Sequence, residues 1–130
     1  MILPMVMLMA APTAEQPQGA ARAALLDAAR APAEADLGKP VRFVVTRLEQ
    51  RGDWAFLLAD MQNPHGRPVD FAGSKLADAA REGMVSHGYA ALLRLKGGRW
   101  TVVDHATGPT DVAWEGWAAD HGAPAELFAS

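Results

Sequence analysis

Apolar and polar positions follow the alternation of β-strands in the middle of the chain. Residues 41–50 (VRFVVTRLEQ) and 54–61 (WAFLLADM) are rich in β-branched and aromatic side chains, which favour strands. The first strand is expected to carry Val41, Phe43 and Val45 on one face and Val44, Thr46 and Leu48 on the other. The second divides into Trp54, Phe56 and Leu58 against Ala55, Leu57, Ala59 and Met61. Arg51-Gly52-Asp53 connects the two strands, and we interpret it as a hairpin turn rather than an integrin-binding tripeptide.

A second hairpin is predicted around Gly97-Gly98, because two glycines supply the positive φ angles of a tight turn. The flanking strands are residues 88–96 (GYAALLRLK) and 99–105 (RWTVVDH). Regular pairing from this turn places Lys96 opposite Arg99 and His105 opposite Ala90.

Helical patterns lie at both ends of the chain. Residues 20–31 form a helix of good helix formers that Pro32 is expected to stop. A short helix over 75–82 is expected between Ser74 and Gly83 as a lid on a sheet edge. A final helix is expected to open at Thr110 or Asp111 and to end at Gly122 and Pro124, with Leu127 and Phe128 folding back as an apolar tail. Its apolar side comprises Val112, Ala113, Trp114, Trp117 and Ala118.

This order predicts a single α+β domain over residues 20–130. It contains an N-terminal helix, a four-stranded antiparallel sheet built from two hairpins, and a C-terminal helix. By analogy of element order it resembles cystatin-like or NTF2-like folds, in which helices pack on one face of a curved sheet. Fold analogy of this kind does not determine function.

The composition argues against several classes of function. Of 130 residues, 50% are hydrophobic and 21% charged, which is typical of a globular domain. The formal net charge is −3 and the pI is about 5.7, which argues against a general nucleic-acid binder. Cysteine is absent, so disulfides, thiol catalysis and thiolate metal sites are excluded.

The first residues indicate where in the cell the protein is located. Residues 1–11 (MILPMVMLMAA) are uncharged and apolar, too short to span a bilayer but suited to the apolar core of a secretory signal. We therefore expect a signal peptide over residues 1–14 and a periplasmic or secreted protein. The alternative is a cytoplasmic protein with an apolar N-terminus, because no basic residue precedes the run.

No catalytic or metal-binding motif stands out. The four histidines are His65, His87, His105 and His121, and none forms a zinc-type pair. Ser86 lies beside His87, but no nucleophile elbow is present. We expect no catalytic residue, no metal and no cofactor.

The four tryptophans are the remaining residues that indicate either core packing or a binding site. Most are expected to clasp the final helix to the sheet, and the alternative is that some line a groove between helix and sheet. Under that alternative the candidate ligand-binding residues are Trp54, Trp100, Asp104, His105 and Trp114.

Three stretches carry a resemblance, namely residues 54–59, 91–114 and 117–128. They resemble uncharacterised exported single-domain proteins of Gram-negative bacteria. The resemblance covers most of the chain after Pro40. It implies an exported location and a single domain, and it assigns no catalytic residue.

Two functions remain open. The first is an exported, non-catalytic binding domain for a protein or a cell-envelope component, with no nucleic-acid partner and no stable membrane span. The second is a small periplasmic hydrolase or ligand-binding enzyme with a groove between the C-terminal helix and the sheet, and Asp104 or His105 at its mouth. The sequence leaves the ligand and the oligomeric state open.

Overall fold

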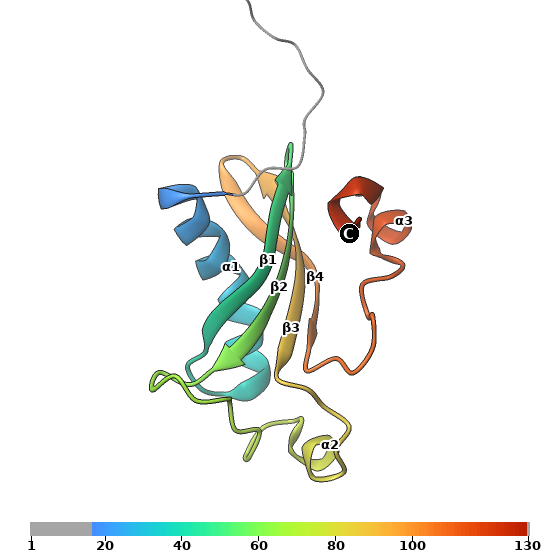
Figure 1. The fold of residues 1–130 in the computed structure, drawn as a ribbon. Helices are drawn as coiled ribbons and strands as arrows, with labels where there is room; N and C mark the ends of the chain where they lie inside the picture. The colour runs from blue at the N-terminus through green and yellow to red at the C-terminus, as the bar shows by residue number, and fades with distance from the viewer. Residues whose placement is uncertain (1–16, 130) are drawn as a thin grey trace, which may run out of the picture.

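Four antiparallel strands form one sheet in the order β1-β2-β3-β4 (Figure 1). In this computed structural model, which describes residues 17–129, they are β1 (Arg42–Arg51), β2 (Trp54–Gln62), β3 (Gly88–Lys96) and β4 (Arg99–Thr107). The helices are α1 (Gly19–Leu37), α2 (Ala77–Arg81) and α3 (Trp117–His121), followed by a 3-10 turn, η1 (Ala125–Phe128). The predicted α+β class and both hairpins are confirmed. The predicted signal peptide lies outside the described residues.

The two hairpin turns are those expected from the glycines. Gly97 and Gly98 have φ values of 56° and 77°, so the pair forms the tight turn that ordinary residues disfavour. Lys96 pairs with Arg99 directly across it. In the first hairpin Arg51 pairs with Trp54 around Gly52.

Helix α1 runs six residues beyond its predicted end, so the expectation that Pro32 stops it is wrong. Proline lacks the N–H that would bond one turn back, and it normally disrupts a helix interior. Here the buried positions continue past it at a spacing of four: Leu25, Ala29, Ala33 and Leu37. Burial of this stripe against the sheet offsets the lost hydrogen bond. The helix ends at Gly38, whose backbone N–H donates to the carbonyl of Glu34 at 2.7 Å.

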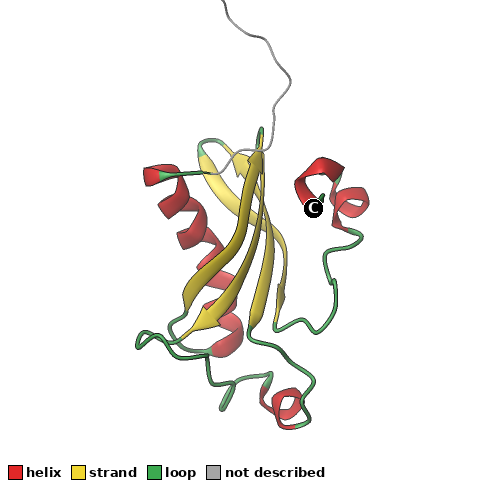
Figure 2. Cartoon of the chain, viewed as in Figure 1, coloured by secondary structure: helices red, strands yellow, loops and turns green. Residues whose placement is uncertain are grey.

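Helices α1 and α3 lie on opposite faces of the sheet, not on one face (Figure 2). We call the side covered by α1 the α1 face, and the side covered by residues 108–129, the C-terminal segment, the C-terminal face. The central strands β2 and β3 are buried on both sides, because their alternate side chains enter separate cores. The α1-face core includes Leu25, Leu37, Leu57, Met61, Tyr89 and Leu93. The C-terminal-face core includes Trp54, Phe56, Leu92, Trp117 and Leu127.

A β-bulge in β1 changes one predicted face. Val45 pairs with Ala59 and Arg47 with Leu58, so Thr46 is the extra residue. Leu48 therefore shares the α1 face with Val45, whereas strict alternation predicts opposite faces. The same shift turns Arg47 toward the C-terminal face, where it contacts the end of the chain.

Two predicted helices are shorter than expected. The C-terminal helix does not begin at Thr110 or Asp111; residues 109–112 are irregular, residues 113–116 form a turn, and helix begins only at Trp117. Val112 is consequently 54% exposed rather than on a buried helical face. Gly122 ends α3 as predicted, and the Leu127–Phe128 tail folds back onto the sheet.

Helix α2 is a single short turn. In Figure 1 it lies beyond the ends of the strands, not over a sheet edge as expected. Ser74 precedes it, and its Oγ accepts the N–H of Leu76 at 3.1 Å. Leu76 and Ala80 close the end of the α1-face core.

Candidate functional site

The five residues predicted to bind a ligand divide between the two faces of the sheet. Trp54 and Trp114 pack in the C-terminal-face core. Asp104 also reaches the C-terminal segment. Trp100 packs against the other core, and His105 contacts α1. The structure therefore does not bring the five together into one site.

A second β-bulge explains the position of His105. Pairing follows the predicted register from Lys96–Arg99 to Leu93–Val102, and then shifts by one residue. His105 consequently pairs with Ala91, not with Ala90 as predicted. Since Ala90 belongs to the C-terminal-face core and Ala91 to the α1-face core, the bulge turns the imidazole toward α1.

On the α1 face, His105 belongs to a cluster around Asp36. The Asp36 carboxylate lies 3.0 Å from Nε2 of His105 and accepts the hydroxyl of Thr107 at 2.7 Å. Lys75 forms an ion pair with it at 2.6 Å. Burial by itself raises the pKa of Asp36, but the bonds from Lys75, Thr107 and His105 outweigh burial and lower the pKa. The cluster ties the end of α1 to β4.

Tyr89 lies beside this cluster without joining it. Its ring stacks on Phe43 at 5.1 Å between centroids and lies 5.9 Å from the ring of His105. Burial, with a smaller contribution from the charge of Asp36, raises the pKa of Tyr89 far above its ordinary value. The phenol therefore stays neutral, as part of the core.

Asp104, the neighbour of His105, makes the corresponding contact on the opposite face. Its carboxylate lies 2.7 Å from Nε2 of His121, at the end of α3. Two adjacent residues of β4 thus take part in aspartate–histidine pairs that hold different layers against the sheet.

The hydroxyls near these pairs are directed elsewhere. Ser74 donates to the carbonyl of Phe71, and Ser86 donates to the carbonyl of Pro109. Thr107 donates to Asp36 itself. In this arrangement none of the three presents its oxygen to an imidazole as an activated nucleophile would.

Phe56 is the centre of the contact between the sheet and the C-terminal segment. The centroid of its ring lies 4.6 Å from that of Phe128, 5.9 Å from that of Trp114 and 6.4 Å from that of Trp117. The contact with Trp117 is edge to face. These separations are typical of favourable aromatic pairs. The expectation that tryptophans clasp the C-terminal helix thus fits Trp117 and Trp114, whereas Trp100 lies on the other face.

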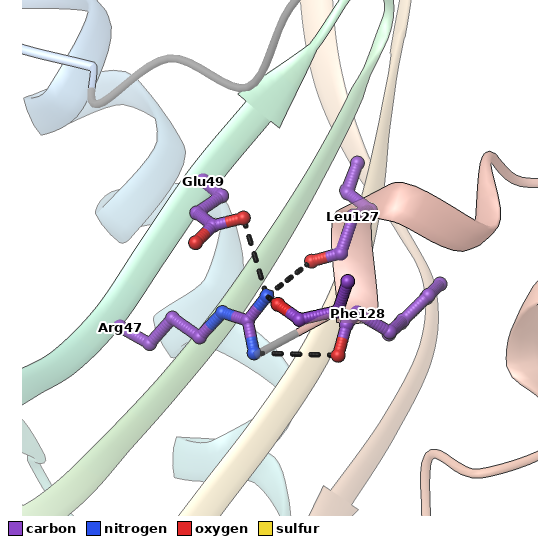
Figure 3. Close-up of polar contacts among 5 residues, drawn as sticks. Arg47, Glu49, Leu127 and Phe128 are labelled. Atoms are coloured by element: carbon purple, nitrogen blue, oxygen red, sulfur yellow. Dashed lines mark hydrogen bonds and ion pairs between the residues drawn. The ribbon is translucent and has the colours of Figure 1, made fainter.

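Arg47 holds the last described residues in place (Figure 3). Its guanidinium donates to the carbonyls of Leu127 at 2.8 Å and Phe128 at 3.4 Å. It also donates to the carbonyl of Ala129 and pairs with Glu49 at 3.2 Å. The carbonyls that end a helical turn lack partners within it, and an arginine supplies them here.

A groove remains where the C-terminal segment leaves the sheet. We call it the Trp114 groove; its volume is about 200 Å³ and its lining is mostly apolar. The sheet contributes its floor, and residues 109–114 form its wall. Its lining residues are Thr46, Leu58, Ala59, Gly88, Tyr89, Pro109, Asp111 and Trp114. Of the five predicted ligand-binding residues, Trp114 alone lines it.

Two larger hollows are open to solvent. One, of about 410 Å³, lies at the first hairpin tip beside Trp54, whose ring is covered by Arg94 at 4.7 Å. The other, of about 460 Å³, lies within the β2–β3 connection, between α2 and residues 69–72, where Phe71 meets His87. Neither contains Asp104, His105 or Trp114.

Within residues 17–129, no three histidine or carboxylate side chains converge as a metal site would require. In the same part of the chain, no helix has the length and apolar character needed to cross a membrane. The chain matches no protein-family model, no curated protein and no solved structure. The cystatin-like or NTF2-like analogy is accordingly not confirmed.

Sequence reasoning did not identify Arg47, Asp36 or the role of Phe56. Phe56 was assigned to the correct face, so its contact with the C-terminal aromatics followed once their docking was known. The sequence does not indicate the role of Arg47, because the bulge at Thr46 decides from which face of the sheet its side chain projects. Asp36 lies beyond Pro32, where the helix was expected to have ended already.

Proposed function

We propose that this protein is an exported, non-catalytic binding domain whose ligand occupies the Trp114 groove. The observation that carries the proposal is the groove itself, an apolar hollow with a half-buried tryptophan in its wall. Ligand sites are typically concave and mostly apolar, with a few polar groups that set orientation. Thr46 and Asp111 supply such groups here.

The alternative, a small hydrolase acting in this groove, has less support. Neither Asp104 nor His105 lines the groove. Their carboxylate and imidazole are engaged by His121 and Asp36, respectively. Ser86, the serine nearest to the groove wall, donates its hydroxyl to the backbone of Pro109.

The binding site is tested by NMR with the full chain and a library of small apolar and aromatic fragments. Binding in the Trp114 groove shifts the indole N–H resonance of Trp114. The Trp100 indole, on the opposite face of the sheet, serves as the internal control. Fragments that shift Trp100, or no tryptophan at all, would overturn the assignment of the groove.

The export part of the proposal rests on the apolar run over residues 1–11. Expression of the full chain in a Gram-negative host, followed by cell fractionation and N-terminal sequencing, tests it. A processed chain in the periplasm supports export. An intact chain in the cytoplasm contradicts it and leaves the groove assignment unaffected.

A further inference from the structure

Two carboxylates lie beside the Trp114 groove without an observed counter-ion. Asp111 is part of the groove wall. Asp60 lies on β2, two residues beyond Leu58, whose side chain forms part of the floor. For neither carboxylate is an ion pair or hydrogen bond found among residues 17–129.

The sheet register places Asp60 at the groove. Side chains alternate along β2, so Phe56, Leu58 and Asp60 project toward the C-terminal face. Asp60 pairs with Gly88, another lining residue. Because glycine has no side chain, no side chain from that β3 position separates the Asp60 carboxylate from the groove.

Two arginines of β1 on this face, Arg47 and Arg42, form hydrogen bonds away from the groove carboxylates. Arg47 donates to the carbonyls of the chain end. Arg42 donates to the carbonyl of Pro64, at 3.4 Å. The groove therefore combines an apolar lining with two rim carboxylates, and neither of these arginines forms an ion pair with them.

We propose that the ligand of the Trp114 groove is a small organic cation, an ammonium or guanidinium group on a compact apolar body. This inference rests on the proposed function and names its ligand class. The apolar body packs on Leu58 and Pro109, and the cation lies near Asp111 and Asp60. An indole face attracts such a cation as well, so Trp114 serves both parts of the ligand.

Three probes of similar shape and different charge test the inference. They are 2-phenylethylammonium, 2-phenylethanol and 3-phenylpropanoate, each titrated into the full chain while the Trp114 indole resonance is followed. We expect the cation to bind more tightly than the neutral alcohol by about two- to fivefold, as for ion pairs near a surface. The anion should bind more weakly than both. High salt should remove most of the difference, because it screens exposed charges.

Two variants locate the charge effect. Asp111→Asn and Asp60→Asn should each reduce the preference for the cation and leave the affinity for the alcohol unchanged. Asp27→Asn is the matched control, since Asp27 is an exposed aspartate on α1, on the other side of the sheet. It should leave all three affinities unchanged.

The outcomes separate this inference from the proposed function. If no probe shifts the Trp114 resonance, the inferred ligand class is wrong, and the fragment library alone decides whether the groove binds any ligand. If alcohol and ammonium bind equally, or the anion binds best, the groove is a binding site but the inferred ligand class is wrong. A preference for the cation that survives both aspartate substitutions also overturns the inference.

Discussion

The Nε2 atom of His121 lies 2.7 Å from the carboxylate of Asp104, and this contact joins the end of α3 to the sheet. Beside it in the chain, His105 bonds Asp36 on the opposite face. Neighbouring residues of a strand project to opposite faces, and the bulge in β4 decides that Asp104 faces the C-terminal segment and His105 faces α1. Each layer therefore has its own polar tie to the same strand.

His121→Ala should destabilise the protein modestly, by about 1 kcal/mol, because the pair is partly exposed and solvent weakens it. Urea unfolding measures the change. His65→Ala is the control, since His65 lies in an exposed loop. Equal stability of the two variants would show that the Asp104 contact contributes nothing to holding α3.

Asp36 should make stability sensitive to acid. Burial raises its pKa, but the bonds from Lys75, Thr107 and His105 leave it lowered in the folded state. The unfolded chain, where an aspartate titrates at about 3.9, thus binds the proton more readily. The resulting stabilisation is fully present above that pH and is lost as the pH falls through the folded pKa.

The measurement is the free energy of unfolding against pH for the wild type and Asp36→Asn. We expect a constant difference between about pH 5 and pH 7 that shrinks below about pH 4. Asp78→Asn, a change on the exposed surface of α2, should follow the wild-type curve. A difference that stays constant into acid would contradict the role given to the Asp36 carboxylate.

Trp117→Ala should destabilise the protein by about 3–5 kcal/mol, as large aromatic truncations in cores do. Trp117 is 5% exposed and meets Phe56 edge to face. Trp114→Ala should cost less, because Trp114 is half-buried at the groove. Chemical denaturation of the two variants compares them, and a larger loss for Trp114 would reverse our account of how this segment docks.

Arg47→Met should loosen the end of the chain. It removes the donors to the carbonyls of Leu127 and Phe128, and bonds to charged groups contribute about 1.5–3 kcal/mol each when well formed. We expect faster hydrogen exchange over residues 125–129 and a lower midpoint of unfolding. Arg42→Met, the same change elsewhere in β1, should leave exchange at the chain end at its wild-type rate.

Pro32→Ala should stabilise α1. Alanine restores the missing backbone N–H within the helix, and an interior proline costs up to about 3 kcal/mol relative to alanine. Thermal unfolding measures the gain. Pro40→Ala, outside the helix, is the matched control. An unchanged or lower midpoint for Pro32→Ala would mean that the helix already accommodates the proline ring without strain.

The sequence by itself determined the elements whose causes are local. The Gly97-Gly98 turn sets the second hairpin, and alternation along β2 assigns its side chains to the correct faces. These features were predictable because a turn residue or a period of two acts over a few neighbouring residues.

Only the tertiary structure decided the features that depend on distant partners. Helix α1 continues through Pro32 because Ala33 and Leu37 are buried against the sheet, a gain that local propensity does not contain. The bulges at Thr46 and Val103 each add one residue to a strand, and so reverse the faces of the residues that follow. His105 and Arg47 therefore face partners on α1 and in the C-terminal segment, respectively. The Trp114 groove exists because residues 109–116 are not helical and face the sheet across a gap before α3 packs on Phe56. That path is decided by packing between segments far apart in the chain.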